Sequence, residues 1–180
     1  MHALLRLTLA ATLMLVGPAA FADTTDVKTN KVNEGIFSLI SAASCVDLDG
    51  KHKCVSAADL KKAAGAADIS ALMVPTWAAG PVKSLGADHR RIEGLIAPGT
   101  WNVDPAGSPE SILGGLISSS GHQYEQGGLL DAGAAANMTP YQILIVASLV
   151  QRESNPQDFA KVARVIYNRL ATPDHRKLQF

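Results

Sequence analysis

Apolar residues between positions 139 and 170 recur at helical spacing and predict two consecutive helices. Thr139 can cap the first helix, because a proline follows it and a glutamine three residues on completes a capping box. The pair Asn155-Pro156 ends this helix, since the residue before a proline avoids the helical region, and it also starts the second helix. Ile145 makes the first helix apolar on nearly every face, so we expect it to be buried. The second helix carries an apolar stripe: Phe159, Val162, Ala163, Ile166 and Leu170.

Glu153 lies close to the junction of these two helices. At about 100° per residue it falls among Val146, Leu149 and Val150. A carboxylate on an apolar face is costly to ionise, and the last turn of a helix carries a partial negative charge. Both effects favour the neutral acid, which is the form that a general acid needs near pH 7. The residues leave a structural alternative open, an ion pair with a nearby arginine (Arg152, Arg164 or Arg169).

The rest of the pattern predicts more helices and one pair of strands. Helices are expected over Val32–Ala43, over Ala57–Ala67 with Ser56 as its cap, from Ser108-Pro109 onward, and over Leu129–Ala136. Leu72–Leu85 contains Pro75 and Pro81 and is expected to be packed but irregular. Arg91–Val103 is expected to form a strand, a turn at Pro98-Gly99 and a return strand. We therefore predict an α+β fold: a mostly helical, single catalytic-type domain with a small antiparallel sheet and a cysteine hairpin.

Two cysteines, Cys45 and Cys54, flank a segment in which Asp49-Gly50 is a strong hairpin-turn signal. Residues that face each other across such a hairpin lie close enough to bridge, so an exported protein would form a disulfide here. Closing so short a loop stabilises a fold by roughly 2–3 kcal/mol. A metal site would have to use His52 or Asp47, and the sequence offers no second ligand pair at metal spacing, so we predict no metal.

The first 22 residues have the features of a signal peptide. A short basic start precedes the apolar run Leu7–Val16, and Ala20-Phe21-Ala22 is a small-x-small cleavage site. We expect cleavage after Ala22, or retention of the segment as a membrane anchor, and a location in the extracytoplasmic cell envelope. Residues 23–180 then form one domain, a size that can bury a core of its own.

The charge balance excludes nucleic acid as a partner. The chain has 16 basic and 16 acidic residues, and only 5% of its residues are aromatic. It therefore has neither the field that attracts a phosphate backbone nor the rings on which bases stack. No phosphate-binding glycine loop, nucleophile elbow or His-Glu-x-x-His motif is present.

Four sequence blocks stand out in order: RRIEGLIAPGTWNV from Arg90, ASLVQRES from Ala147, VARVIYNRL from Val162, and the final LQF. Together they resemble the MltG/YceG-like endolytic murein transglycosylases, closest to their actinobacterial branch. The resemblance runs from about Asp23 to Phe180 and covers a middle portion of the family. The family usually has a transmembrane anchor and a LysM-like subdomain before this portion, and it continues through Asp-x-Thr after it.

The resemblance implies roles for particular residues. The catalytic glutamate of the family's acid-x-Glu pair matches Glu153, and the first acid of that pair is Gln151 here. The Glu-Gly element that lines the family's cleft matches Glu93, for which an ion pair with a neighbouring arginine or histidine is the structural alternative. Further substrate-binding candidates from the matching blocks are Gln151, Asn168, Arg169 and Gln179. Trp77 is either a platform for a sugar ring or a core anchor.

The resemblance also implies a reaction. A lytic transglycosylase cleaves glycan strands between MurNAc and GlcNAc and leaves 1,6-anhydroMurNAc ends, using one carboxylate and no cofactor. The implied partners are peptidoglycan glycan strands and the peptidoglycan synthases known as penicillin-binding proteins. An alternative is a truncated, inactive exported protein that binds glycan or a synthase. A second alternative, plain hydrolysis, would require a further carboxylate such as Glu93.

Overall fold

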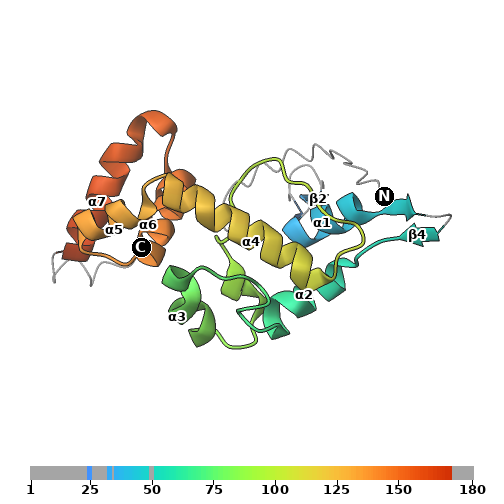
Figure 1. The fold of residues 1–180 in the computed structure, drawn as a ribbon. Coiled ribbons are helices and arrows are strands. Elements are labelled where there is room, and N and C mark those ends of the chain that lie inside the picture. The colour runs from blue at the N-terminus through green and yellow to red at the C-terminus, as the bar shows by residue number, and fades with distance from the viewer. Residues whose placement is uncertain (1–23, 26–31, 34, 49–50, 172–180) are drawn as a thin grey trace. The chain divides into compact units, whose positions relative to one another are not determined.

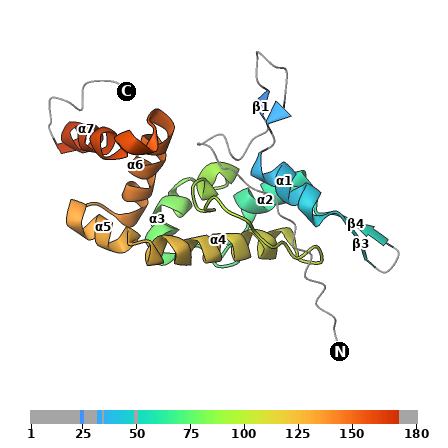
Figure 2. The ribbon, with the colours of Figure 1, turned by 90° about the horizontal axis from the view of Figure 1, so that it is seen from above.

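The computed structural model describes residues 24–25, 32–33, 35–48 and 51–171. The chain forms two compact units, Met1–Gly128 and Leu129–Phe180, which we call the N-terminal and the C-terminal unit. Figures 1 and 2 show the helices of both. Each unit is described by itself.

The N-terminal unit is built from α1 (Ile36–Ser44), α2 (Ala57–Ala66), α3 (Thr76–Ser84), the 3-10 helix η2 (His89–Ile92) and α4 (Pro109–Gln126). Helix α2 packs against α1, α4 and η2. Helix α2 lies beside α4 in both views (Figures 1 and 2). The largest fully buried apolar side chains form the core of this unit: Ile36, Leu60, Leu72, Val82, Ile92, Leu95, Leu113 and Ile117.

The predicted helix starts in this unit are confirmed where a side chain caps them. Ser56 Oγ accepts the Asp59 N–H at 3.0 Å, and Ser108 Oγ accepts the Ser111 N–H at 3.2 Å. Glycines within α4 allow close packing. A Cβ at Gly114 would lie 2.8 Å from the carbonyl oxygen of Ala71, closer than real Cβ atoms come.

The α+β prediction is wrong, because Arg91–Val103 forms η2 and turns instead of two paired strands. Its backbone bonds to side chains of α4: Ser120 Oγ accepts the Ala97 N–H at 2.9 Å, and the Tyr124 hydroxyl donates to the Gly94 carbonyl at 3.0 Å. Gly94 has a φ of +79°, which an extended strand does not use. These bonds replace the ladder that a strand pair would have made.

The described strands form two short antiparallel ladders. One joins β1 (Thr24–Thr25) to β2 (Val32–Asn33), and the other joins β3 (Val46–Leu48) to β4 (Lys51–Lys53). Neither ladder is long enough to form a layer on which helices pack. The described fold is therefore helical. The segment Leu72–Leu85 was predicted to be irregular, but it contains the helix α3. Pro81 removes one backbone hydrogen bond, and the nine-residue helix forms in spite of that loss.

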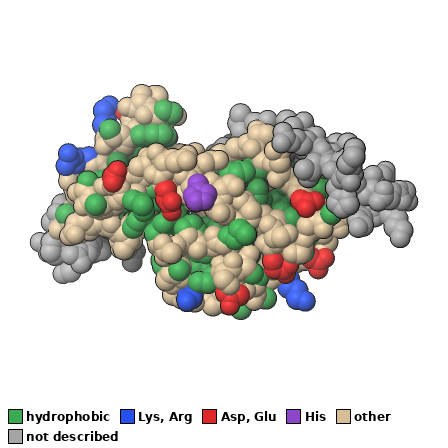
Figure 3. Space-filling model, viewed as in Figure 1, with side chains coloured by type: hydrophobic (Ala, Val, Ile, Leu, Met, Phe, Trp, Pro, Cys, Tyr) green, Lys and Arg blue, Asp and Glu red, His purple; other side chains and the backbone are tan. Residues whose placement is uncertain are grey.

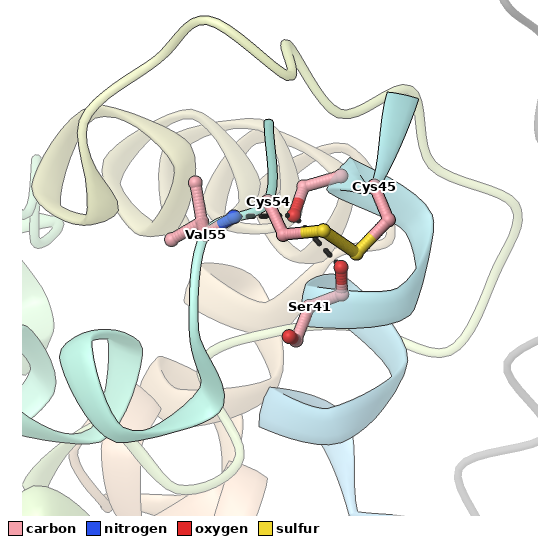
Figure 4. The surroundings of a disulfide bond; sticks show 5 residues. Ser41, Cys45, Cys54 and Val55 are labelled. Carbon is pink, nitrogen blue, oxygen red and sulfur yellow. Dashed lines mark hydrogen bonds between the residues drawn. A yellow bond between two sulfur atoms is a disulfide. The ribbon is translucent and has the colours of Figure 1, made fainter. Parts of the chain in front are cut away.

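The predicted disulfide between Cys45 and Cys54 is confirmed (Figure 4). It closes the segment that carries β3 and β4, whose predicted turn at Asp49-Gly50 lies outside the described residues. Ser44 connects the same two parts of the chain by hydrogen bonds. Its hydroxyl donates to Ser41 O at 2.8 Å and accepts the Val55 N–H at 2.9 Å. The segment is thus tied to the end of α1 twice.

The C-terminal unit consists of α5 (Leu129–Ala136), α6 (Pro140–Glu153), the 3-10 helix η3 (Pro156–Asp158) and α7 (Phe159–Ala171). Helix α6 packs against both α5 and α7. The predicted capping box of α6 is confirmed: Thr139 Oγ1 accepts the Gln142 N–H at 3.2 Å, and Gln142 Oε1 accepts the Thr139 N–H at 2.9 Å. Asn137, with a φ of +53°, ends α5 as expected.

The expectation that α6 is buried on nearly every face is wrong. Its buried residues are Ile143, Val146 and Val150, whereas Ile145 and Leu149 are 46% and 41% exposed. The core of the unit is a small cluster of Val146, Val150 and Ile166, against which partly buried residues of α7 pack. Helices α5 and α7 therefore cover one side of α6 and leave the Ile145 side open within this unit.

The predicted signal peptide, residues 1–22, lies outside the described residues. Within the described part of the chain, no single helix combines the length and apolarity needed to cross a membrane. Helices α5 and α6 pass that test only as a pair, and they are bent by 97° at their junction. Apolar core helices pass the same test, so this pair does not define a span.

Candidate active site

Glu153 is the last residue of α6, as the sequence predicts. Ser154 follows in an extended conformation, with φ −152° and ψ 164°, and its hydroxyl donates to the Val150 carbonyl at 2.8 Å. One of the free carbonyls at the helix end is thereby satisfied by a side chain. Helix η3 begins at Pro156, so the Glu153 carboxylate stands at a corner between two helices.

The predicted burial of Glu153 is wrong. The residue is exposed, and so is Leu149, one of the three apolar neighbours that the helical spacing assigned to it. In the described part of the chain the Glu153 side chain makes no hydrogen bond or ion pair, so the structural alternative of an arginine partner is not found there either. The carboxylate is open to solvent and to any ligand that reaches this corner.

A groove of about 470 Å³ runs between α6 and α7. We call it the α6–α7 groove. Its lining residues are Ile143, Val146, Ala147, Val150 and Gln151 from α6 and Phe159, Ala160, Ala163 and Tyr167 from α7. The polar side chains among them are Gln151 and Tyr167, and Gln151 precedes Glu153 by two residues. An apolar groove with a few polar groups is the usual form of a ligand site.

The structure brings only one of the predicted substrate-binding residues into this groove, namely Gln151. Asn168 is exposed and Arg169 is half-buried, and neither lines the groove, while Gln179 lies outside the described residues. Tyr167 lines the groove although the sequence analysis did not select it. The spacing of Phe159, Ala163 and Tyr167, four residues apart each time, could have shown that they share one face of α7.

Glu93, the second candidate carboxylate, lies in the N-terminal unit directly after η2. It is half-buried, and burial raises its pKa, whereas the nearby charge of Arg90 acts to lower it. The expected structural ion pair is absent from the described residues, because Arg90 binds Asp88 instead, at 2.6 Å. These hydrogen bonds lower the pKa of Asp88 to about 2. Glu93 is thus a partly desolvated carboxylate without a described partner.

Arg91 and Trp101 belong to the same sequence block as Glu93, and their side chains bind backbone carbonyls. The Arg91 side chain is buried and donates to three backbone carbonyls, those of Ala64, Ala67 and Gly86. Trp101 Nε1 donates to the Ala97 carbonyl at 3.0 Å. Among the residues that the structure describes, no group of three or more His, Cys, Asp and Glu side chains could hold a metal ion.

A family model described as the YceG-like family matches residues 12–180. The matched range includes both units and contains Glu93, Gln151 and Glu153. No curated protein matches the chain.

Proposed function

The chain belongs to the YceG-like family of transglycosylases, which gives it a peptidoglycan-related function, and we propose that it is an endolytic lytic transglycosylase. Its substrate is the glycan strand of peptidoglycan, cleaved between MurNAc and GlcNAc. Glu153 is the general acid and then the general base.

The proposed reaction uses one carboxylate twice. Glu153 donates its proton to the glycosidic oxygen, and the bond from that oxygen to C1 of MurNAc breaks, which frees the 4-hydroxyl of GlcNAc. The C6 hydroxyl of the same MurNAc bonds to C1 and gives its proton to the Glu153 carboxylate. The products are a 1,6-anhydroMurNAc end and a new GlcNAc end, and no water is consumed. A hydrolase would need a second carboxylate beside the bond.

The observation that carries the proposal is the position of Glu153 at an exposed helix corner, two residues beyond the edge of the α6–α7 groove. An internal bond of a long polymer can reach a carboxylate on an open surface, whereas a closed pocket would admit only chain ends. A bound strand would remove water from the carboxylate, and desolvation favours the protonated form that a general acid needs. Gln151 replaces the family's first acid and can bind a sugar hydroxyl or acetamido group.

The test is mass spectrometry of the products after intact peptidoglycan is incubated with the full chain. We expect anhydroMurNAc-ended fragments, and a loss of at least about 10³-fold in their rate of formation for Glu153→Gln. The matched control is Asp158→Asn, which neutralises another carboxylate of the same helix junction, one that pairs with Lys161 at 2.8 Å, and leaves the rate near wild type. Equal product from Glu153→Gln and wild type would disprove the role of Glu153.

The exposure of Glu153 favours one rival function, an exported protein that binds glycan or a peptidoglycan synthase without cleaving. The two functions differ in one experiment: a non-cleaving binder co-sediments with insoluble peptidoglycan and releases no anhydroMurNAc ends. Reducing ends among the products would instead indicate hydrolysis, with Glu93 as the candidate second carboxylate.

We further propose that the protein works in the extracytoplasmic cell envelope, where peptidoglycan lies, with residues 1–22 as its signal peptide or anchor. Peptidoglycan synthases are its candidate protein partners. Cell fractionation and N-terminal sequencing of the recovered protein test the location. A mature chain that starts at Asp23 supports cleavage after Ala22, and recovery of the uncleaved chain in the cytoplasm would contradict export.

A further inference from the structure

The residue just before α3 lies very close to α4 at Gly121. A Cβ at this position would lie 2.6 Å from the Cγ of Pro75, the residue that precedes α3, so the contact requires glycine. Tyr124 and Glu125 follow Gly121 by three and four residues and therefore lie on the same face of α4. The close approach places the first turn of α3, with Trp77, alongside them.

Trp77 is held from two sides. Its indole N–H donates to Glu125 Oε1 at 2.9 Å, and the Tyr124 ring meets the indole at 75° with centroids 6.4 Å apart. Tyr124 is itself fixed, because its hydroxyl donates to the Gly94 carbonyl. Burial raises the pKa of Tyr124 to about 12, so this hydroxyl keeps its proton. Trp77 remains half-buried, which leaves part of a rigidly held indole in contact with solvent.

Polar groups flank this indole. The Glu125 side chain is 36% exposed, and its Oε2 lies 3.9 Å from Nδ1 of His122, whose side chain is 74% exposed. Figure 3 shows a histidine beside an acidic side chain over α4, with hydrophobic side chains around them. One open face of the N-terminal unit therefore carries the fixed indole of Trp77, the carboxylate of Glu125 and the imidazole of His122.

We propose that Trp77, Glu125 and His122 form a saccharide-binding site for the β-1,4-linked N-acetylated glycan, made of residues that the reaction at Glu153 does not use. The apolar face of a pyranose ring packs on the indole, Glu125 accepts from a sugar hydroxyl, and His122 contacts the rim of the sugar. The choice of glycan as ligand rests on the proposed function. The site holds an additional stretch of the strand and so favours cleavage within long chains.

The geometry favours a sugar over a cationic ligand such as an amine of a stem peptide. Recognition of ammonium groups uses several ring faces around one cation. Here Tyr124 packs against Trp77, and its hydroxyl is bound to the backbone, so the two rings do not form a cage. One Glu125 oxygen is also already engaged by the indole N–H. A single aromatic surface with polar groups at its edge suits a pyranose ring.

Binding is tested on the full chain carrying Glu153→Gln, so that the ligand is not consumed. With Trp101→Phe added, Trp77 is the one remaining tryptophan, and its fluorescence reports on this site alone. We expect saturable changes in emission on addition of chitin oligosaccharides or of glycan strands freed of their stem peptides. In co-sedimentation with insoluble peptidoglycan, Trp77→Ala and Glu125→Gln should each weaken binding, Trp77→Ala by about tenfold.

Circular dichroism of each variant checks that the helices are intact, and Trp77→Phe, which keeps a ring, should lose less affinity than Trp77→Ala. Unchanged Trp77 fluorescence in a folded sample with saturating glycan would overturn the site. A response to free stem peptide and not to glycan would overturn its assignment to sugars. Failure of the proposed reaction can be told apart from failure of this binding site. It would appear as a lack of anhydroMurNAc ends from the chain with native Glu153, whether or not Trp77 binds glycan.

Discussion

The two units differ in how completely they bury their apolar residues. The N-terminal unit has a core of many fully buried side chains, a disulfide, and a long irregular segment whose backbone is bonded to side chains of α4. In its described part, the C-terminal unit buries five apolar residues (Leu129, Ile143, Val146, Val150 and Ile166) and exposes five large ones (Leu130, Ile145, Leu149, Val165 and Leu170). The unit that carries Glu153 is thus the less completely buried one. Binding surfaces commonly expose apolar area of this kind.

The largest expected effect is on the core of the N-terminal unit. Leu113→Ala removes a fully buried side chain and should lower the free energy of unfolding by roughly 2–5 kcal/mol. The matched variant in the C-terminal unit is Leu149→Ala, which also lies within a helix but has a side chain that is 41% exposed. Its free energy of unfolding should change by no more than about 0.5 kcal/mol. Urea unfolding measures both. Equal losses would show that the α6 surface is covered and that the contrast between the units is wrong.

A second large effect should come from Arg91. Its guanidinium donates to the carbonyls of Ala64 and Ala67 at the end of α2, and Arg91→Met would leave them unsatisfied. We expect a loss of about 3 kcal/mol in the free energy of unfolding. Arg90→Met is the control, because Arg90 is exposed and binds only Asp88 among the described residues. If Arg90→Met lowered the free energy of unfolding as much as Arg91→Met, the hydrogen bonds of Arg91 to these carbonyls would not be the cause of the loss.

The sequence predicts well the features that depend on neighbouring residues. Ser56, Ser108 and Thr139 cap helices through bonds to residues three positions on, so the local pattern contains all the information. The disulfide was predictable for the same reason, since its turn signal lies between the two cysteines.

Features that depend on distant residues were missed. Gly94 and Ala97 are bound by Tyr124 and Ser120, 30 and 23 residues away, and no short pattern shows that these bonds replace a strand pair. Trp77 and Glu125 are 48 residues apart, so their hydrogen bond could not be predicted. The exposure of Glu153 was missed because an apolar pattern identifies which face can be buried but not whether another element covers it.

The smallest expected effect is a pair of opposite pH dependences beside η2. The Arg90 hydrogen bonds lower the pKa of Asp88 from 3.8 to about 2. A carboxylate with a lowered pKa in the folded state contributes stability that is present above about pH 4 and is lost as the pH falls through about 2. Both Asp88→Asn and Arg90→Met should flatten this acid limb of the stability curve. An unchanged limb in both variants would show that the pair does not persist in solution.

Glu93 should act in the other direction. Burial raises its pKa, so its contribution to stability is present below the ordinary pKa of a glutamate and is lost as the pH rises through the raised value. Glu93→Gln removes that loss and should make the N-terminal unit more stable near neutral pH, whereas Asp88→Asn should make it less stable. Urea unfolding curves at a series of pH values measure the two slopes. The same slope sign for both carboxylates would mean that Glu93 is solvated, and its candidacy as a partly desolvated acid would end. Opposite signs would show that two carboxylates only five residues apart in the chain lie in opposite environments. The exposed Arg90 stabilises the charged form of Asp88, whereas partial burial stabilises the neutral form of Glu93.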